Sequence, residues 1–588
     1  MDSKHVTEST SGQEDIQKTW WKEAIIYQIY PRSFQDSDGD GIGDLNGITS
    51  RLDYIQSLGV DIIWLNPIFL SPNDDNGYDI SDYREIMREF GTMEDFDRLL
   101  KEIHKREMRL VLDLVVNHTS DEHPWFEEAR KSRHNPYYKY YHWWPAEKGE
   151  PPLRLSYFDE EGNAWTYNKP TDSYYLHYFS RKQPDLNWEN PEVRQEIFDM
   201  MRFWFDKGID GFRMDSISLI AKDPSFPLID SKKYPDIFSF YAKEPRLHLY
   251  LHEMNRQVLS KYDCMSVGEG SAVMVDDVAK FVDPAREELN MLYHFDAARI
   301  RNTTLPDNPE SGIDYSLIAL KKMFTEWDKA VDKGWPSIYL GNHDQPRMVS
   351  RFGSDKDEFR ALSAKMLITF LLTMRGTPYW FAGDEIGMRN IRFDRIEDYN
   401  DIDTINRYKK AKAEGKDPQA VLDEQKETGR DNARTPFQWD RSPEAGFTAG
   451  TPWLKVNPDY TWINVADEEK DPTSILNYFK KVVSFRKENP SLIYGSYHLL
   501  DAENPQSYTF LRKTGADTYL IMLNFSPKAA ISTPGIDMSN AHVLLDNYGD
   551  RSHMAPQKDI TLRPFEAIVF QLNHPVYESF IDSLDLLE

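Results

Sequence analysis

The chain alternates between short apolar runs and longer stretches with helical spacing. Ala24–Tyr30 and Val60–Leu65 are apolar at most positions, which is typical of strands buried on both faces of a parallel sheet. Thr92 and Asp95 stand where a helix start requires them, and apolar residues from Phe96 to Ile103 follow at helical spacing. Eight such runs, separated by helical patterns, predict an α/β fold with a (β/α)8 TIM barrel. The predicted strands are Ala24–Tyr30, Val60–Leu65, Arg109–Val116, Gly208–Met214, Met265–Gly268, Met291–Phe295, Ser337–Gly341 and Pro378–Ala382.

Two long insertions interrupt this alternation. Residues 119–189, after the third strand, are rich in Tyr, Trp, Pro and His and too long for an ordinary loop, so we expect a small inserted domain, domain B. Residues 390–451, after the eighth strand, form a second, charged insertion. The barrel, domain A, is therefore expected over residues 20–118 and 190–498.

The pattern changes again near Leu499. Short stretches of alternating residues replace the α/β alternation and predict a C-terminal antiparallel β-sandwich, domain C, over residues 499–588. Residues 1–19 are polar and lack the apolar core of a signal peptide, so we expect a disordered N-terminal tail. The predicted strands of domain C are Tyr508–Arg512, Thr518–Asn524, His542–Leu545 and Ala567–Leu572.

Composition narrows the classes of function. The chain carries 97 acidic and 70 basic residues, a net charge of −27, which argues against binding nucleic acid because that binding rests on cationic side chains. No stretch of the sequence reaches the roughly 18 consecutive apolar residues of a membrane helix. We therefore expect a soluble, cytoplasmic protein with a small neutral or cationic ligand, present as a monomer or weak homo-oligomer. Cys264 is the only cysteine, which excludes an intrachain disulfide.

An Asp/Gly-rich segment, Asp36–Asp44, follows the first predicted strand. Carboxylates at alternate positions, with glycines that permit a tight turn, resemble the first nine positions of a calcium-binding loop. Gly47 stands where such a loop carries a bidentate Glu. We expect a structural Ca²⁺, with Mg²⁺ as an alternative, or else a turn that binds no ion; the chemistry below needs no metal and no organic cofactor. The expected ligands are Asp36, Asp38, Asp40, Asp44 and the carbonyl of Ile42.

Arg213 and Asp215 stand two residues apart at the end of the fourth predicted strand. Residues at this spacing share one face of a strand, so both side chains should project together. A guanidinium beside a carboxylate lowers the pKa of the carboxylate and keeps it ionised, as a nucleophile requires. A structural Arg–Asp pair is the alternative, and the rest of the chain has to decide between the two.

Polar residues follow the apolar runs at the carboxyl ends of several predicted strands. Active-site groups of a TIM barrel come from those ends. Asp215 and Glu269 end the fourth and fifth strands, and neighbouring strands lie roughly 4.8 Å apart. Their carboxyl groups are expected about 5–5.5 Å apart, the separation of a retaining glycosidase, whereas an inverting pair needs about 6.5–9.5 Å. The other groups at this face are Tyr78-Asp79, Asn117-His118 and Asn342-His343-Asp344.

This geometry favours a covalent mechanism. Asp215 would attack the anomeric carbon as the nucleophile, while Glu269 would protonate the leaving oxygen. We expect burial and nearby anions to raise the pKa of Glu269 for that role.

Several motifs together resemble the signature regions of glycoside hydrolase family 13, the α-amylase family. The resemblance runs from about Trp20 into the C-terminal β domain, and two of the motifs are similar to its oligo-1,6-glucosidase/α-glucosidase branch. The family-wide motifs are Asp113–His118, Gly211–Asp215, Gly268-Glu269 and Asn342–Asp344, and the branch motifs are Gln183–Asn187 and Arg430–Trp439.

The resemblance implies roles for further residues. Asp344 is expected to hold sugar hydroxyls as the ring distorts, and Tyr78 to stack beneath the same glucose. Asp79 and Arg430 would close the pocket beyond the non-reducing 4-hydroxyl, so that cleavage is exo. The family also implies calcium at the Asp36–Asp44 loop. The remaining implied site residues are His118, Arg213 and His343 around the glucose, with Tyr167 and Phe179 near the entrance.

The function that the resemblance implies is an exo-acting, retaining α-glucosidase on short α-gluco-oligosaccharides. Ser216 follows the nucleophile, at a position where branch members acting on α-1,6 bonds usually carry Val and those preferring α-1,4 bonds carry Thr or Ala. A small, hydroxylated residue there favours α-1,4 or sucrose-type linkages over α-1,6 linkages.

Alternatives stay open within and outside this class. A sucrose isomerase would form isomaltulose or trehalulose; such enzymes carry a charged Arg/Asp-rich run where this chain has Ala298–Thr304 without acidic residues. An oligo-1,6-glucosidase and a trehalose-bond enzyme are further possibilities. A catalytically inactive transporter partner would lack the acids and carry a membrane helix, whereas this sequence keeps the acids and has no such helix.

Overall fold

The computed structural model describes residues 18–158, 162–230, 232, 237–515, 517–536, 538, 541–551 and 558–572. The predicted N-terminal tail falls almost entirely outside these residues, as does the end of domain C from residue 573.

Eight parallel strands form one sheet that curves into a barrel, in the order β11-β10-β9-β5-β2-β1-β13-β12. The edge strands β11 and β12 are joined by side chains: Ser337 Oγ donates to the Leu292 carbonyl (2.9 Å), and the Tyr339 hydroxyl donates to the His294 carbonyl (2.6 Å). The predicted TIM barrel is confirmed. Its strands are β1 (Ile26–Ile29), β2 (Ile62–Leu65), β5 (Arg109–Val115), β9 (Gly211–Asp215), β10 (Met265–Glu269), β11 (Met291–Tyr293), β12 (Ser337–Ile338) and β13 (Thr377–Phe381).

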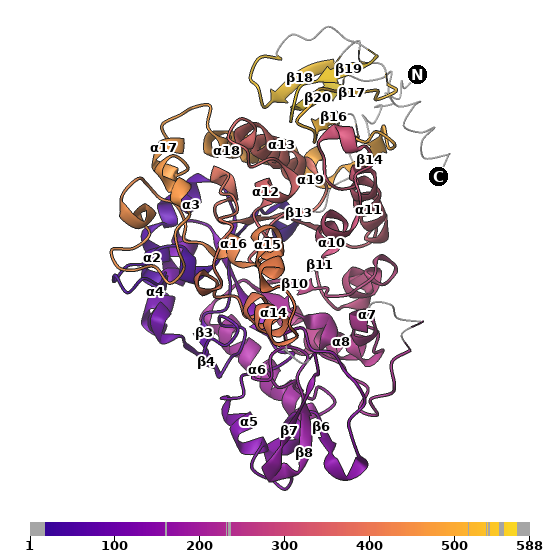
Figure 1. Cartoon of the computed structure of the whole chain (residues 1–588). Helices are drawn as coiled ribbons and strands as arrows, with labels where there is room; N and C mark the ends of the chain where they lie inside the picture. The colour runs from indigo at the N-terminus through magenta and orange to yellow at the C-terminus, as the bar shows by residue number, and fades with distance from the viewer. Residues whose placement is uncertain are drawn as a thin grey trace, which may run out of the picture.

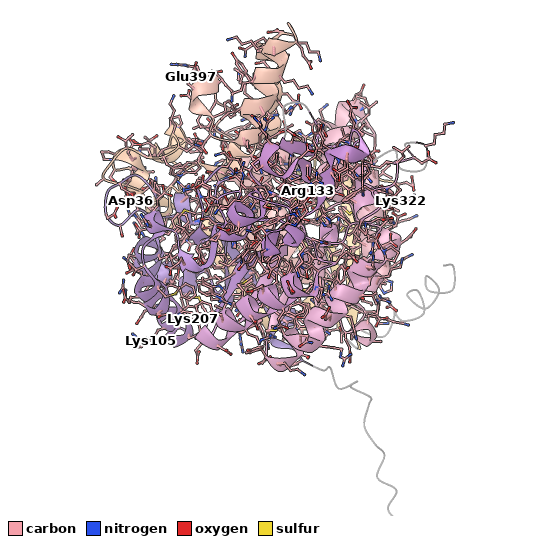
Figure 2. The ribbon with its side chains drawn as sticks, turned by 90° about the horizontal axis from the view of Figure 1, so that it is seen from below. Asp36, Lys105, Arg133, Lys207, Lys322 and Glu397 are labelled. Carbon is pink, nitrogen blue, oxygen red and sulfur yellow. The ribbon has the colours of Figure 1, made fainter. Side chains whose placement is uncertain are left out.

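Helices surround this sheet. The Thr92 side chain accepts from the Asp95 N–H and the Asp95 carboxylate accepts from the Thr92 N–H, so α4 begins with the capping box expected from the sequence. Lys207 of α6 pairs with Asp97 of α4 (2.7 Å), and Figure 2 shows Lys105 and Lys207, the last residues of these helices, together at the rim. The main helices of the ring are α3 (Leu52–Ser57), α4 (Met93–Lys105), α6 (Pro191–Lys207), α8 (Arg246–Gln257), α11 (Leu317–Ala330), α13 (Arg360–Thr373) and α18 (Ile475–Glu488).

All eight barrel strands differ from their predicted bounds by at least one residue, and the fourth and seventh show the largest differences. The fourth was expected from Gly208, but Gly208 has φ +107° and caps the C-terminus of α6, a left-handed position that glycine adopts without strain. β9 therefore begins at Gly211 and runs on to Asp215. The seventh strand, β12, is only Ser337–Ile338, shorter than the predicted Ser337–Gly341.

Domain B follows β5, where the insertion was expected. Its three strands pair antiparallel in the order β6-β8-β7, and α5 (Pro124–Ala129) precedes them. In Figure 1 this sheet projects at one end of the molecule, opposite the C-terminal strands. The strands are β6 (Trp143–Pro145), β7 (Trp165–Asn168) and β8 (Ser173–Leu176).

The second insertion folds into three helices: α14 (Ile402–Ala413), α15 (Pro418–Thr428) and α16 (Asp431–Arg434). α14 and α15 pack side by side over the barrel (Figure 1). This insertion brings residues distant in sequence to the same face of the barrel as the carboxyl ends of the strands.

The C-terminal region is antiparallel, as predicted. A five-stranded sheet in the order β14-β15-β16-β20-β18 is accompanied by the two-stranded pair β17-β19. Ile560 and Leu562 of β19 share a hydrophobic cluster with residues of the larger sheet, so the two sheets enclose one core. The first strand begins at Ser496, just before the predicted domain boundary at residue 499. The strands are β14 (Ser496–Leu500), β15 (Ser507–Thr514), β16 (Asp517–Asn524), β17 (Ala530–Ser532), β18 (Ala541–Asp546), β19 (Ile560–Leu562) and β20 (Ala567–Leu572).

Among the described residues, no helix has both the length and the apolar character needed to cross a membrane.

Candidate active site

One guanidinium connects the two predicted catalytic acids. Arg213 on β9 donates from Nη1 to Asp215 Oδ1 (2.8 Å) and from Nη2 to Glu269 Oε2 (2.5 Å). The same Nη1 also binds Asp113 Oδ1 (2.5 Å), and Nε binds the Tyr293 hydroxyl (2.8 Å). β9 and β10 are neighbours, with Met214 beside Gly268, so Asp215 and Glu269 leave the barrel side by side. The structure therefore brings both acids into one site.

Burial sets the protonation of this pair. It raises the pKa of Asp215 to about 6, although Arg213 acts in the opposite direction. The sequence-based expectation that Arg213 keeps this pKa low is therefore wrong, because the loss of water outweighs the guanidinium. Burial, together with the negative charges of Asp215 and Asp344, raises the pKa of Glu269 to about 8, in the direction that was predicted. Glu269 thus keeps its proton to higher pH than Asp215.

Two serines that come shortly after the catalytic acids in the sequence also hold Glu269. The backbone N–H of Ser216 donates to Glu269 Oε2 (3.1 Å), and Ser271 Oγ donates to Glu269 Oε1 (3.1 Å). Ser216 adopts a left-handed conformation with φ +42°, which turns the chain sharply after β9. Ser216 therefore has a positioning contact with the acid as well as lining the cavity.

Two arginines hold the third acid. Asp344 Oδ1 lies 3.3 Å from Arg430 Nη1 and 3.1 Å from Arg434 Nη2. Burial disfavours the charged form of Asp344, but His343, Arg430 and Arg434 hold its pKa well below the usual range. Asp344 is accordingly an ionised acceptor at neutral pH, suited to hydrogen bonds from sugar hydroxyls.

Tyr78 and two histidines form one flank of the site. The Tyr78 hydroxyl lies 2.7 Å from His343 Nε2 and 3.1 Å from Asp113 Oδ2, and its ring stacks on His343 with the centroids 5.3 Å apart. His118 Nε2 contacts the Tyr78 carbonyl (3.0 Å). Burial lowers the pKa of His118 and of His343 to about 3, so both imidazoles are neutral hydrogen-bonding groups rather than proton donors for the reaction.

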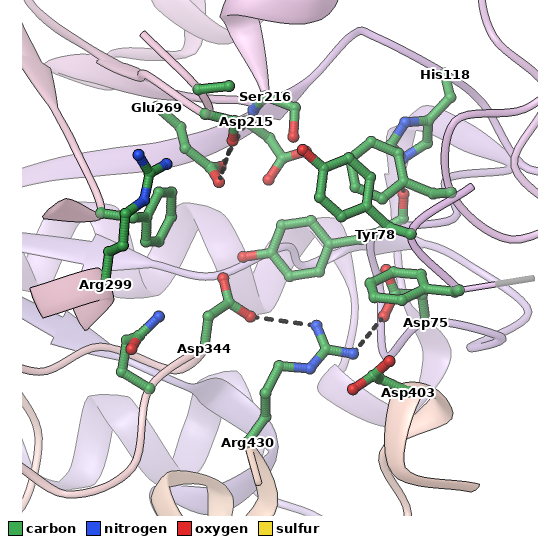
Figure 3. A pocket seen from close by; sticks show the side chains of 17 residues that line it. Asp75, Tyr78, His118, Asp215, Ser216, Glu269, Arg299, Asp344, Asp403 and Arg430 are labelled. Carbon is green, nitrogen blue, oxygen red and sulfur yellow. Dashed lines mark hydrogen bonds and ion pairs between the residues drawn. The ribbon is translucent and has the colours of Figure 1, made fainter. Parts of the chain in front are cut away.

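These side chains surround a cavity of about 440 Å³, within the roughly 300–1,000 Å³ of small-molecule sites. Figure 3 shows Asp215 and Glu269 facing Asp344 and Arg430 across it. Arg213 and His343 lie beneath this lining. The lining residues are Asp75, Tyr78, His118, Tyr157, Phe158, Phe179, Asp215, Ser216, Glu269, Ser271, Ala272, Phe295, Arg299, Asp344, Gln345, Asp403 and Arg430.

Asp79 lies away from the cavity, contrary to what the resemblance implied. It is fully buried, and its carboxylate accepts from the N–H groups of Asp74 (2.8 Å) and Asp75 (3.0 Å) within its own loop. Asp75 takes the expected place instead: it lines the cavity, and its Oδ1 lies 3.5 Å from Arg430 Nη2. The closing wall is therefore Asp75, Arg430 and Asp344.

Tyr167 also lies away from the entrance. On β7 it is 47% exposed and donates to Asp172 Oδ1 (2.8 Å), on the surface of domain B. The aromatic residues at the cavity are Phe179, as predicted, with Tyr157 stacked on it at 5.1 Å and Phe158 at 5.7 Å.

Several residues at the cavity were not predicted from the sequence. Asp75 precedes Tyr78 in a segment with three aspartates, and the segment alone does not show which one faces the cavity. Arg434 lies within the quoted Arg430–Trp439 motif, so the sequence could have indicated it as a site residue. Arg299, on α10 (Asp296–Thr303), lies within the quoted Ala298–Thr304 segment but was not assigned to the site, and Asp403 gave no local signal because α14 of the second insertion delivers it.

The aspartate loop fits a hard cation in part. Asp36, Asp38 and Asp40 each place an oxygen within 4.8 Å of the others. Burial and the neighbouring carboxylates raise the pKa of Asp40, so a cation here would relieve repulsion. Asp44 is committed elsewhere: it caps α2 (Leu45–Ser50) by accepting from the Gly47 N–H (2.7 Å). The residues present therefore suit an oxygen-ligated ion held by three aspartates, and the predicted fourth carboxylate ligand serves a helix start.

An eight-stranded barrel that carries two bridged carboxylic acids and a third ionised acid at its carboxyl end defines a carbohydrate-active barrel enzyme. The comparison with protein families agrees: the family described as "Alpha amylase, catalytic domain" matches residues 28–495. The chain belongs to the α-amylase family, glycoside hydrolase family 13, and is a glycoside hydrolase of that type.

Several relatives that match most of the chain are named as glucosidases. The oligo-1,6-glucosidase of Parageobacillus thermoglucosidasius is 51% identical over 571 residues, which is 95% of this chain and 100% of that protein. The oligo-1,6-glucosidase of Bacillus cereus is 49% identical over 95% of this chain and 100% of its own length. The α-glucosidase of Pediococcus pentosaceus is 43% identical, covering 94% of this chain and 99% of the relative.

Solved structures share the whole fold. A trehalulose synthase in complex with Tris superposes with a TM-score of 0.89 at 43% identity, covering 94% of this chain and 100% of that one. An isomaltulose synthase from Klebsiella gives a TM-score of 0.90 at 42% identity, covering 95% and 100%.

Proposed function

We propose that the protein is an exo-acting, retaining α-glucosidase that releases glucose from the non-reducing end of short α-gluco-oligosaccharides. The observation that carries this proposal is the guanidinium of Arg213, which binds one oxygen of Asp215 and one of Glu269. Acids bridged in this way face the same sugar, and a close pair is the arrangement of a double displacement.

The reaction would run in two steps. Ionised Asp215 attacks the anomeric carbon as protonated Glu269 donates its proton to the leaving glycosidic oxygen, which gives a glucosyl ester on Asp215. Glu269, now ionised, then removes a proton from water, and that water displaces Asp215 from the anomeric carbon. Asp344 would hold two sugar hydroxyls, and its ionised state supports such hydrogen bonds in the distorted ring.

The wall of Asp75, Arg430 and Asp344 supports exo cleavage. Arg430 is anchored by Asp401, with Nε 2.7 Å from Oδ1, and reaches towards both other acids. A pocket closed by these charges has room for one terminal glucose and offers hydrogen bonds to its end hydroxyls.

Product stereochemistry tests the mechanism. Proton NMR during the first minutes of hydrolysis should show α-glucose, the retained anomer, before mutarotation. Initial β-glucose would refute double displacement. The variant Asp215→Ala should lose hydrolysis of nitrophenyl α-glucoside, and normal turnover by it would refute the nucleophile assignment.

For linkage, we propose α-1,4 or sucrose-type bonds, on the basis of Ser216 after the nucleophile. An oligo-1,6-glucosidase is the second candidate, and the names of relatives at 51% and 49% identity favour it. Rates on maltose, isomaltose, sucrose and trehalose, measured side by side, separate the two. Isomaltose hydrolysis far ahead of maltose would refute the inference from Ser216.

A sucrose isomerase is a third candidate, which the structural relatives named trehalulose and isomaltulose synthase favour. The absence of acidic residues from Ala298–Thr304 speaks against it. Isomaltulose or trehalulose appearing from sucrose would support isomerisation, and glucose with fructose alone would support hydrolysis.

We also propose a structural Ca²⁺, or Mg²⁺, at the aspartate loop, held by Asp36, Asp38 and Asp40. Such an ion would neutralise the three carboxylates and fix the turn that leads into α2. A cytoplasmic location and a monomeric or weakly associated state stay predictions from the sequence, which cell fractionation and light scattering would check.

A further inference from the structure

The wall of the glucose pocket depends on a helix from outside the barrel. Asp401, the N-cap of α14, accepts from the Thr404 N–H through Oδ2 (3.0 Å) and holds Arg430 through Oδ1 (2.6 Å to Nη2). Asp403 in the first turn of the same helix lines the cavity. The start of α14 therefore fixes the cationic part of the wall.

The same helix also reaches domain B. Asn406, one turn further along α14, donates from Nδ2 to the backbone carbonyl of Phe158 (2.5 Å). Phe158 belongs to the domain B segment that lines the cavity, and its ring lies 4.9 Å from the guanidinium carbon of Arg430. This contact links two insertions that are separated by most of the barrel sequence.

These contacts close a ring around the end of the pocket. Arg430 is held on one side by Asp401 and covered on another by Phe158, and Asn406 sets the distance between α14 and Phe158. Without the Asn406 donor, the Phe158 carbonyl loses its contact with α14, and the Phe158 segment of domain B can move away from Arg430. The cavity would then extend past the position of the terminal glucose.

We propose that Asn406 is a positioning residue, whose hydrogen bond to the Phe158 carbonyl keeps the Phe158 segment of domain B against Arg430 and limits the pocket to one terminal glucose. This inference rests on the proposed exo-glucosidase function. Asn406 acts through Phe158 and Arg430, so it should affect binding and the number of sugars accommodated, and leave the chemical step and its pH dependence unchanged.

The test compares Asn406→Ala and Asn406→Asp with the wild type and with Lys410→Ala. Asn406→Asp keeps the side-chain volume but lacks the N–H donor, and therefore separates the hydrogen bond from packing. Lys410 is an exposed residue in the last turn of the same helix. Thermal unfolding checks that each variant folds.

On nitrophenyl α-glucoside, we expect both Asn406 variants to raise KM and the inhibition constant of glucose about fivefold, the effect of one hydrogen bond, with kcat within about twofold of the wild type and the same pH profile. On nitrophenyl α-maltoside, the wild type and Lys410→Ala should release no maltose. Both Asn406 variants should release maltose with nitrophenol, because the opened pocket can hold two glucosyl units.

Two outcomes would overturn the inference: KM and glucose inhibition unchanged in folded Asn406→Asp, or a loss confined to kcat. Release of maltose by the wild type itself is a different result, because it would refute the exo function on which the inference rests, irrespective of Asn406.

Discussion

At the scale of single residues, the division of protons between Asp215 and Glu269 decides whether the site can work. Both acids bind the same guanidinium, both are buried, and both have two anionic neighbours: Asp113 and Asp344 for Asp215, and Asp215 and Asp344 for Glu269. A hydrogen bond from Glu269 to Asp215 favours the ionised form of Asp215, so Glu269 keeps its proton to higher pH. The nucleophile and the proton donor therefore differ through their surroundings, although both are carboxylic acids.

This division predicts a bell-shaped pH profile. Asp215 must be ionised, so kcat/KM should rise with pH through about 6, and Glu269 must be protonated, so kcat/KM should fall above about 8. In Glu269→Gln, the fall above pH 8 should disappear on a nitrophenyl glucoside, whose leaving group needs little protonation. On an oligosaccharide, the same variant should be slower by about 10²–10⁴-fold. A fall above pH 8 that persists in Glu269→Gln would assign that limb to another group.

Asp75 and Asp79 offer a second comparison of single residues. Asp75→Ala removes a carboxylate beside Arg430 and should lower kcat/KM for nitrophenyl α-glucoside by about 10–100-fold, the loss of a charged hydrogen bond of about 1.5–3 kcal/mol. Asp79→Ala removes the acceptor of two loop N–H groups and should lower the melting temperature. If Asp79→Ala alone weakened substrate binding in a protein of unchanged stability, the wall described here would be wrong.

At the scale of elements, turns and caps deliver the functional groups. The aspartate loop places Asp36, Asp38 and Asp40 together, and the next aspartate, Asp44, starts α2. In the second insertion, the N-cap of α14 also holds Arg430. In both segments, an aspartate at the end of a loop caps the following helix: Asp44 caps α2, and Asp401 caps α14. Asp401 also shapes the pocket, because it holds Arg430.

The aspartate loop predicts a response to chelation. Removal of a bound ion by EDTA should lower the melting temperature by about 2–4 °C, because an ion that binds only the folded state stabilises it. Added Ca²⁺ should restore the original melting temperature. In Asp38→Ala, neither EDTA nor added Ca²⁺ should change the melting temperature. An unchanged melting temperature with EDTA would favour a turn that binds no ion.

At the scale of the whole molecule, buried cations join the barrel to the C-terminal sheets. Lys321 of α11 is fully buried and donates to the carbonyls of Asn504 (2.8 Å), Asp501 (3.1 Å) and Ser507 (3.2 Å). Arg512 of β15 donates to the carbonyls of Thr373 (2.6 Å) and other residues at the end of the barrel. Such contacts fix the two parts relative to each other far from the cavity.

Lys321→Met should therefore destabilise the fold without altering the site. Three carbonyls lose a charged donor, which should cost about 3 kcal/mol or more in the free energy of unfolding, measured by urea titration. Lys322→Ala is the matched control. Lys322 is the next residue in the sequence, and its side chain is 74% exposed and points outwards in Figure 2. Kinetics on nitrophenyl α-glucoside at 25 °C should match the wild type in both variants, and a loss of kcat in folded Lys321→Met would contradict a purely structural role.

The sequence by itself determined the barrel and its principal acids. Apolar runs buried on both faces can be recognised from the local sequence alone. A residue that follows such a run lies at the carboxyl end of a barrel strand, so Asp215, Glu269 and Asp344 were correctly predicted to lie at one face.

The tertiary structure alone decided which loop residues face the cavity and what pKa values the catalytic acids have. Asp79 turns inwards because the N–H groups of its own loop bind it, while Asp75 meets Arg430, which lies in the turn between α15 and α16 of the second insertion. The pKa of Asp215 follows from burial that Arg213, its neighbour in sequence, does not overcome. Local pattern fixes backbone position, whereas side-chain direction and electrostatics depend on groups that folding brings from far along the chain.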